Sequence, residues 1–397
     1  HHGSSSMDFE LSDDQQAFVD TARQFARKSL APHAARWDAE AVFPKDVLRE
    51  AGELGFMSLY TPEADGGMGL SRLDAALIFE ELAAGCTSTA AYMTIHNMAL
   101  WMIATFGNDE TKAEVIPALL TGERLASYCL TEPGAGSDAA SLRTTATLAG
   151  DHYVLDGQKV FISGAGDTDV LVVMARFADG DGPRPGAKGV SSFVVPADAP
   201  GISYGRKEEK MGWNSQPTRA ITFDGVRVPA SRRIGAEGEG FRIAMRGLDG
   251  GRINIATTAV GTAQAALDAT LRYTAERRQF GQAIGAFQNT QFRLADMGTE
   301  LVAARQMVRL AASRLDAGHP EATVYCAMAK RFATDVAFEV CNTAMQLHGG
   351  YGYIREYPIE RHVRDVRVHQ ILEGTNEIMR VIVARRLAMD GATEVIR

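Results

Sequence analysis

The sequence predicts an α+β fold made of three consecutive parts, which are helical, β and helical in that order. Apolar residues recur at helical spacing up to about residue 120. Short β-branched and aromatic runs separated by Gly, Asp and Pro follow from Leu125, and the helical period returns after Gly240. We therefore expect an N-terminal helical domain at residues 7–124, a middle β domain at 125–234 and a C-terminal helical domain at 235–397.

Length and composition limit the class of protein. A chain of 397 residues is too long for one ordinary hydrophobic core, and 46% hydrophobic with 23% charged residues is a globular composition. A net charge of −8 argues against a nucleic-acid binder, because such proteins normally carry a basic face. These values argue against a single small binding module and are consistent with a chain that folds around a packed core.

Cysteine spacing and hydropathy bear on location. The four cysteines are far apart and form no CxxC pair, so neither a zinc site nor a disulfide framework is indicated: Cys86, Cys129, Cys326 and Cys341. No apolar run reaches the roughly 20 residues that a membrane span needs. The first six residues, HHGSSS, are typical of an affinity-tag remnant rather than a targeting segment. We expect a cytoplasmic protein without a metal.

Each part of the chain has local signals for its elements. The segment SDDQ from Ser12 is a capping box that begins a helix, and further helices are expected at 46–55, 73–84, 90–106 and 110–120. In the middle part, Asp156-Gly157 is typical of a two-residue hairpin turn. Runs at 190–195, 219–223 and 226–228 continue without helices, which predicts an antiparallel barrel or sandwich.

The last part contains four long helical segments, near 241–275, 288–317, 321–347 and 374–389. Helices of this length, joined by short connections, are typical of an antiparallel four-helix bundle.

The segment TEPGAGSD resembles a dinucleotide fingerprint at first sight, because Gly134, Gly136 and Ala139 follow a strand-like run. That fingerprint requires its glycines to open a helix, whereas a β-like stretch follows here, so a nicotinamide site is disfavoured. The segment is either a plain turn or a ligand loop. Its density of glycines, hydroxyls and carboxylates favours a loop whose backbone N–H groups meet a flat heterocycle.

Two further segments allow both a structural and a functional interpretation. The run from Gln346 to Tyr353 ends a helix in glycines, either as a simple C-cap or so that backbone N–H groups approach a pyrophosphate. Glu373 stands in HQILEGTNEIMR after two apolar residues. It is either a surface residue at a helix start or, in a dry pocket, a base with a raised pKa.

These segments stand in the order and spacing of the acyl-CoA dehydrogenase family. CLTEPGAGSDAAS (129–141) resembles the first signature of the family, and QLHGGYGYIREYPIERHVRD (346–365) resembles the second. ERRQFG (276–281) is similar to the flavin-contacting arginine loop of the family, and the resemblance runs from about residue 8 to the end. It implies FAD as cofactor and the helical, β-barrel and four-helix-bundle domains of that family.

Carried over by position, the resemblance implies three sets of binding residues. Those along the flavin ring are Tyr128, Leu130, Thr131, Gly136, Ser137, Phe161 and Ser163. Those reaching the FAD pyrophosphate and adenosine of a neighbouring subunit are Arg277, Gln288, Gln346, Gly349 and Gly350, joined by Thr375 and Glu377, although many relatives have Gln in place of Glu377. Those contacting acyl-CoA are Ser137, Asp249, Gly250, Gly251, Arg252 and Arg385. FAD would then bridge two chains of a homotetramer that is a dimer of dimers.

The resemblance also implies a mechanism. Glu373 removes the α-proton of the acyl thioester while flavin takes the β-hydride, and an electron-transferring flavoprotein reoxidises the flavin. One branch of the family places its base just before the arginine of the DGGR segment, which is Gly251 here. Glu373 is therefore the only base candidate at either position.

Matches outside the signatures indicate the substrate. GWNSQPTRA (212–220), GGRINIA (250–256) and RVHQILEGTNEIMR (367–380) resemble a branch that acts on short, 2-methyl-branched acyl-CoA. We expect isobutyryl-CoA to become methacrylyl-CoA, a step of valine degradation. The alternatives are a short straight-chain or 2-methylbutyryl-CoA dehydrogenase, a flavin oxidase or monooxygenase on the same fold, and a non-catalytic helical scaffold.

Overall fold

The N-terminal unit is helical and begins where the sequence predicts. The computed structural model describes residues 7–397, so the tag-like HHGSSS lies outside the described residues. Ser12 Oγ accepts from the Gln15 N–H at 3.1 Å, and Gln15 Oε1 accepts from the Ser12 N–H at 2.9 Å, which completes the capping box. The helices of this unit are α1 (Asp13–Phe25), α2 (Ala34–Glu40), α3 (Lys45–Glu53), α4 (Arg72–Gly85), α5 (Thr87–Phe106) and α6 (Asp109–Leu120).

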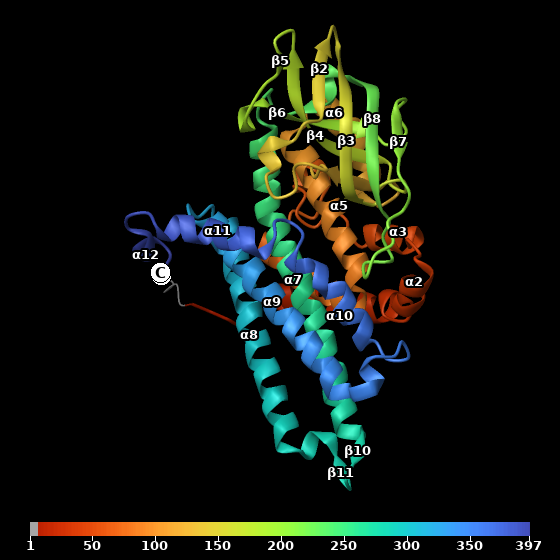
Figure 1. The fold of residues 1–397 in the computed structure, drawn as a ribbon, viewed down its shortest axis with the longest axis vertical. Coiled ribbons are helices and arrows are strands. Elements are labelled where there is room, and N and C mark those ends of the chain that lie inside the picture. The colour runs from red at the N-terminus through yellow and green to blue at the C-terminus, as the bar shows by residue number, and fades with distance from the viewer. Residues whose placement is uncertain (1–6) are drawn as a thin grey trace.

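Helix α5 joins this unit to the rest of the molecule. Sixteen of its 20 residues are buried, so it has no solvent-facing stripe of the kind that a surface helix shows. It contacts α4 and the first strand of the β unit. Figure 1 shows it running from the helical region toward the sheet, which brings its side chains close to elements of all three units.

The middle unit is one large curved sheet. Its strands are β1 (Ala126–Cys129), β2 (Thr145–Ala149), β3 (His152–Ser163), β4 (Val170–Asp179), β5 (Gly182–Pro183), β6 (Val190–Pro196), β7 (Ile202–Tyr204), β8 (Thr218–Pro229) and β9 (Arg233–Ile234). The main path runs β7-β8-β3-β2-β4-β6-β9, and β1 and β5 also pair with β4. Side chains from the distant strands β6 and β8 meet in one buried core, so the sheet curves around its own interior.

Two strand pairings depart from the predicted antiparallel arrangement. Both β1 and β2 run parallel to β4, with Ala126 opposite Val170 and Thr145 opposite Arg176. The two strands therefore follow one another along the same edge of β4. The chain leaves the edge after β1 and returns to it at β2, and this excursion (130–144) contains TEPGAGSD.

The predicted hairpin turn at Asp156-Gly157 is wrong. Both residues lie inside β3, at a register shift between β3 and β8, and Asp156 Oδ1 accepts from the Gly225 N–H at 2.7 Å. The chain reverses instead through the two residues 150–151, which join β2 to β3, and Ala149 pairs with His152 on either side of this turn. An Asp-Gly pair suits a β-bulge as well as a turn, because Gly accepts the unusual backbone angles of both.

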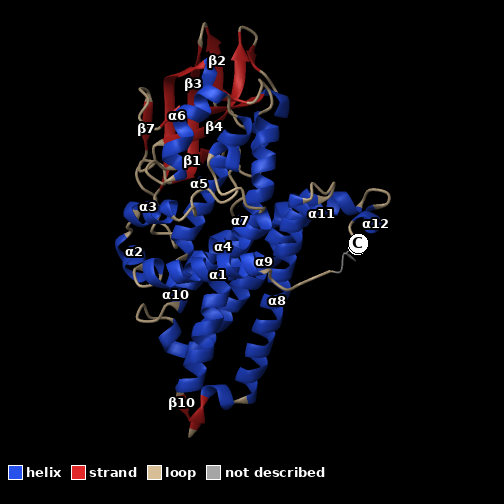
Figure 2. Ribbon diagram, turned by 180° about the vertical axis from the view of Figure 1, so that it is seen from behind, coloured by secondary structure: helices blue, strands red, loops and turns tan. Residues whose placement is uncertain are grey.

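The C-terminal unit is built on three long helices. They are α7 (Gly240–Glu276), α8 (Gln288–Asp316) and α9 (Ala322–His348), and the small hairpin of β10 (Arg278–Gln279) and β11 (Gln282–Ala283) joins α7 to α8. The shorter helices are α10 (Ile359–Arg367), α11 (Asn376–Leu387) and α12 (Ala392–Val395). Both α10 and α11 contact α9, and α4 packs against α7 and α8. In Figures 1 and 2, α11 and α12 project to the side of the bundle.

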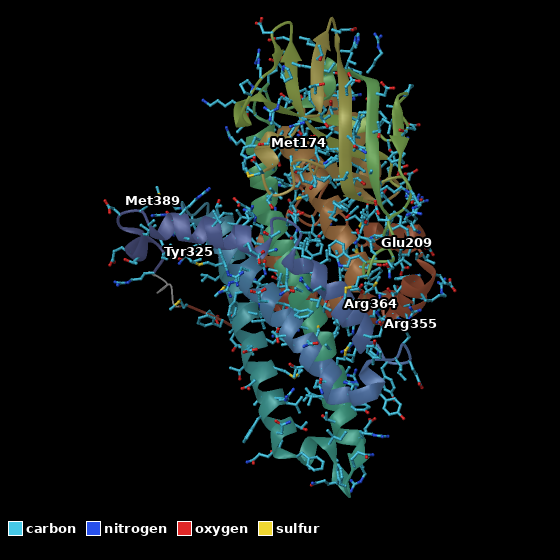
Figure 3. All side chains as sticks on the ribbon, viewed as in Figure 1. Met174, Glu209, Tyr325, Arg355, Arg364 and Met389 are labelled. Atoms are coloured by element: carbon cyan, nitrogen blue, oxygen red, sulfur yellow. The ribbon has the colours of Figure 1, made fainter. Side chains whose placement is uncertain are left out.

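Arg364 in α10 ties the three units together. Its guanidinium donates to Asp38 Oδ2 of α2 at 2.6 Å, to Glu360 Oε2 at 2.6 Å and to the carbonyl oxygen of Met211 at 2.9 Å, which lies between β7 and β8. Figure 3 shows Arg364 at this junction. Within residues 7–397, no helix combines the length and the apolar character that crossing a membrane requires.

Candidate active site

Glu373 lies in a tight turn just before α11. Its backbone φ is +57°, a region that few residues other than glycine adopt, and Gly374 follows with φ +86°. Thr375 then caps α11, accepting from the Ile378 N–H at 3.3 Å. Glu373 is therefore not the first residue of a surface helix, which was the alternative interpretation of this segment.

The carboxylate of Glu373 points into the protein. Its Oε2 atom is buried and has no hydrogen-bond partner among the described residues. A Cβ placed on Gly251 would lie 2.7 Å from Oε2 and 3.3 Å from Met98 Sδ. The carboxylate therefore lies against the backbone of α7 at a position that has no side chain. Burial raises the pKa of Glu373 to about 7, although Arg252 and Lys330 oppose the rise. A carboxyl group with such a pKa can accept a proton near neutrality.

Two cations hold the turn from behind. Arg252 donates from Nε to the carbonyl oxygen of Glu373 at 3.4 Å and from Nη1 to Asp249 Oδ1 at 3.5 Å. Lys330 of α9 has no exposed surface, and its Nζ donates to the Gly374 carbonyl at 2.8 Å and to Asn376 Oδ1 at 2.8 Å. Burial lowers the pKa of Lys330 to about 7, although Glu373 opposes the fall. Lys330 was not predicted from the sequence, because a lysine in a helix is usually solvated.

The excursion 130–144 is fastened to β3 by a buried ion pair. Lys159 Nζ donates to Glu132 Oε2 at 2.7 Å and to the Leu130 carbonyl at 3.0 Å. Glu132 Oε1 also accepts from the Arg143 N–H at 2.6 Å. The Thr131 carbonyl accepts from the Val160 N–H at 2.9 Å, so both ends of the loop are held. The only sequence signal for this pair was a lysine within an otherwise strand-like run.

The predicted flavin-ring residues gather on β1, this loop and β3. Tyr128 has a buried hydroxyl with no hydrogen-bond partner among residues 7–397, and its pKa is raised well above the usual value by burial and further by Glu373. A Cβ on Gly134 or Gly136 would meet no described atom within 4 Å. Phe161, with φ +57°, is 70% exposed where the β3–β8 ladder is interrupted.

An open glycine-rich backbone, an uncovered aromatic ring and an unpartnered hydroxyl fit a flat, polar heterocycle such as the flavin ring. Three other predicted members of this set, Leu130, Thr131 and Ser163, are partly buried at the same place, whereas Ser137 is exposed.

A second predicted FAD set lies at the opposite end of the molecule. These exposed residues surround the lower ends of α7, α8 and α9: Arg277, Gln288, Gln346, Gly349 and Gly350. Figure 1 places the β10–β11 hairpin, which follows Arg277, at the far end from the sheet. Arg277 Cζ lies over the Tyr351 ring, 5.2 Å from its centroid, and a Cβ on Gly349 or Gly350 would meet no atom of residues 7–397 within 4 Å. One chain therefore does not bring the two FAD sets together.

The predicted acyl-CoA residues divide in a similar way. Asp249, Gly250, Gly251 and Arg252 lie on α7 beside Glu373, and Asp249 Oδ2 accepts from Thr323 Oγ1 at 2.9 Å. Arg385 is exposed on α11, as is Glu377 in the first turn of that helix. The side chain of Thr375 serves as the α11 cap, and a nucleotide contact of Thr375 or Glu377 stays a prediction.

Comparison with known proteins gives one consistent result. The family models of the acyl-CoA dehydrogenase N-terminal, middle and C-terminal domains match residues 12–123, 127–226 and 238–388. The mitochondrial isobutyryl-CoA dehydrogenase of Bos taurus is 52% identical over 380 residues, which are 96% of this chain and 90% of the relative. That of Dictyostelium discoideum is 51% identical, with the same coverage.

The fold of this chain is also similar to that of a solved structure. Butyryl-CoA dehydrogenase from Megasphaera elsdenii has a TM-score of 0.92 and 39% identity, covering 96% of this chain and all of that one. These matches confirm the predicted fold class. Both isobutyryl-CoA dehydrogenases carry "mitochondrial" in their names, so a cytoplasmic location stays a prediction.

Proposed function

The chain belongs to the acyl-CoA dehydrogenase family, and on that premise we propose that it converts isobutyryl-CoA to methacrylyl-CoA. It is an FAD-dependent oxidoreductase acting on CH–CH bonds. The buried, unpartnered Oε2 of Glu373, with a pKa raised to about 7, carries the assignment of the proton-abstracting group. FAD, when bound, accepts the hydride that leaves the β-carbon, so that the α,β double bond forms.

In this proposal, Glu373 accepts the α-proton on Oε2. The raised pKa is suited to this role, because a carboxylate of ordinary pKa is too weak a base for a thioester α-proton. Arg252 and Lys330 limit the rise in the pKa of Glu373, because both cations stabilise its ionised form against the effect of burial. The backbone N–H of Glu373 is the donor that would face the thioester carbonyl as charge develops on it.

The residues around β1 and the excursion 130–144 would hold the flavin ring, and Tyr128 of this set is close enough to Glu373 for its charge to raise the pKa of Tyr128. Arg277, Gln288, Gln346, Gly349 and Gly350 would serve the pyrophosphate and adenosine of FAD in a neighbouring subunit. The separation of these two sets within one chain supports a shared site. We extend the proposal to a homotetramer, a dimer of dimers, and to an electron-transferring flavoprotein as electron acceptor.

The surroundings of the base support a short acyl group. A small apolar cluster joins α5, α7, the loop before β8 and the segment that leads to Glu373: Ala91, Ile95, Ile255, Trp213, Val368 and Leu372. Leu372 directly precedes Glu373, and Ile255 lies about one helical turn after Gly251. We propose that these side chains border the acyl group and limit its length, whereas its branching is proposed from the isobutyryl-CoA dehydrogenase relatives.

Flavin bleaching under anaerobic conditions tests the proposal. Isobutyryl-, 2-methylbutyryl-, butyryl- and octanoyl-CoA are mixed with the enzyme, and the loss of visible flavin absorbance is followed, together with kcat/KM in the presence of an artificial acceptor. Isobutyryl-CoA should react best. Each misplaced methylene costs about 1 to 3 kcal/mol, or roughly 10- to 200-fold, so 2-methylbutyryl-CoA should remain a slow substrate. A tenfold advantage for butyryl- or octanoyl-CoA would refute the branched-chain assignment and leave the dehydrogenase assignment intact.

A further inference from the structure

Arg72 is a half-buried cation with two buried donor atoms that no other group among residues 7–397 uses. It is the first residue of α4, and its backbone N–H donates to Asp316 Oδ1 at 2.7 Å. Its guanidinium lies over the ring of Tyr60, with Cζ 3.5 Å from the ring centroid. Its Nε and Nη2 atoms are buried, yet neither has a hydrogen-bond partner among residues 7–397. Leaving charged donors both dry and unpaired is unfavourable, which indicates that something else meets them.

The nearby acid does not serve this purpose. Asp249 contributes to the electrostatic surroundings of Arg72, but its oxygens are bonded to Thr323 Oγ1 at 2.9 Å and to Arg252 Nη1 at 3.5 Å. Arg72 makes no ion pair within 4 Å in the part of the chain that the structure describes. Its guanidinium thus lies over an aromatic ring, while Nε and Nη2 stay without an acceptor in the part of the chain that the structure describes.

Arg72 reaches the same stretch of α7 that Glu373 reaches. A Cβ on Gly250 would collide with Arg72 Nη2, and a Cβ on Gly251 would lie 2.7 Å from Glu373 Oε2. Two neighbouring glycines therefore make room for two charged groups that come from different units. Tyr60 lies near both charged groups. The Arg72 guanidinium lies over its ring, and the charges of Arg72 and Glu373 both act on its hydroxyl: burial raises the pKa of Tyr60, Arg72 lowers it and Glu373 raises it further. The Nε and Nη2 donors of Arg72 and the Oε2 acceptor of Glu373 therefore lie against the same two residues of α7, Gly250 and Gly251.

We propose that Arg72 is a substrate-binding residue whose Nε and Nη2 donate to a carbonyl oxygen of the acyl-pantetheine part of acyl-CoA. The inference rests on the proposed function, because it takes the ligand beside Gly250 and Gly251 to be an acyl thioester. An isobutyryl group has no carboxylate. The oxygens close to its thioester are those of the thioester itself and of the two pantetheine amides, and a guanidinium bonds such oxygens strongly.

The test uses the FAD-loaded enzyme and isobutyryl thioesters of decreasing length. These are the CoA, pantetheine, N-acetylcysteamine and S-ethyl thioesters, and the dissociation constant of each is measured from the change in the flavin spectrum. Arg72→Met should weaken binding of isobutyryl-CoA by roughly 10- to 100-fold, the effect of losing a hydrogen bond to a charged group. If wild type and variant converge for the S-ethyl compound, the acceptor is an amide oxygen. If the deficit persists for that compound, the acceptor is the thioester oxygen.

Arg246→Met is the matched control. Arg246 also stacks on aromatic rings, at 5.7 Å from Trp101 and 5.1 Å from Phe106, but its side chain is exposed and should not affect thioester binding. Should Arg72→Met fail to fold, Arg72→Lys retains the charge and loses the forked donors, and it should show a smaller deficit. Unchanged affinity for all four thioesters in a folded, FAD-loaded Arg72 variant would overturn the proposal, as would an equal loss in Arg246→Met.

The failure of the proposed function would have a different signature. If isobutyryl-CoA does not bleach the flavin of the wild-type enzyme, the substrate assignment fails. The role of Arg72 is then judged with the acyl-CoA that does bleach it, in the same thioester series.

Discussion

The carboxylate of Glu373 and the backbone of Gly251 are close neighbours, because a Cβ at position 251 would lie 2.7 Å from Glu373 Oε2. No rotamer choice at position 251 avoids this, since every side chain begins with that atom. The absence of a side chain on this turn of α7 is therefore a condition for the position of the carboxylate. Positions 251 and 373 are the two at which this family places its base, and in this chain a side chain at 251 would collide with the carboxylate of Glu373.

Gly251→Ala should push the Glu373 carboxylate aside and slow the reaction. We expect at least a roughly tenfold fall in kcat, since misplacing a catalytic group by about 1 Å can cost about 100-fold. FAD content should not change. Gly298→Ala in α8 is the control, because a Cβ there meets no atom of the described chain within 4 Å, and it should keep full activity. An active Gly251→Ala enzyme would show that the carboxylate acts from another position.

Glu373→Gln should bind FAD and acyl-CoA but reduce flavin very slowly. The amide has the same shape as the carboxylate and no basicity, and loss of a general base costs about 10²- to 10⁴-fold. Rapid mixing with isobutyryl-CoA under anaerobic conditions measures the rate. Glu339→Gln, an exposed residue on α9, should behave like the wild type. Bleaching of Glu373→Gln at a normal rate would remove Glu373 from the mechanism.

The pH dependence of flavin reduction should report Glu373. Its pKa is raised to about 7, so the carboxylate is mostly protonated below that pH and mostly ionised above it. Since only the ionised form accepts a proton, the rate should rise with pH through about 7 and then level off. Lys330 lowers this pKa, so Lys330→Met should move the rise to higher pH. A shift to lower pH, or no shift, would contradict the electrostatic role of Lys330.

Breaking the Glu132–Lys159 pair should destabilise the β unit. Lys159→Met leaves the Glu132 carboxylate buried beside two backbone N–H groups without its cation, and removing one member of a buried pair costs about 3 to 5 kcal/mol. Because the pair fastens the excursion 130–144, FAD affinity should also fall. Thermal unfolding and FAD titration measure the two effects. The double change Glu132→Gln with Lys159→Met should recover part of the stability, and equal losses in both variants would contradict the pairing argument.

Arg277→Ala should weaken FAD binding and assembly together. If Arg277 contacts the FAD of a neighbouring subunit, the variant should lose FAD more readily and dissociate at higher protein concentration than the wild type. Light scattering and flavin content, measured on the same samples, test this. Arg293→Ala, an exposed residue of α8, is the control. A wild-type monomer that retains all of its FAD would disprove the shared site.

Local sequence signals were reliable where short-range chemistry decides the conformation. The capping box at Ser12 forms as expected, because both of its partners lie within four residues. The glycines after His348 end α9, with Gly349 at φ +59°. The Asp156-Gly157 pair failed as a signal because a turn and a bulge use the same residues, and only pairing with β8 distinguishes them.

The order of the three units, the helical and strand periods within them and, through the motifs, Glu373 as the base candidate can all be predicted from the sequence. Three contacts became known only from the folded chain: Glu373 faces Gly251, Lys330 donates to the turn that follows Glu373, and Arg72 lies against Gly250 with two buried donors that no group among residues 7–397 accepts. The difference arises because periodicity records which face of an element is buried, whereas the pKa of a carboxyl group depends on what is buried beside it. Those neighbours come from α4, α7 and α9, which are far apart in the chain and meet only when it folds.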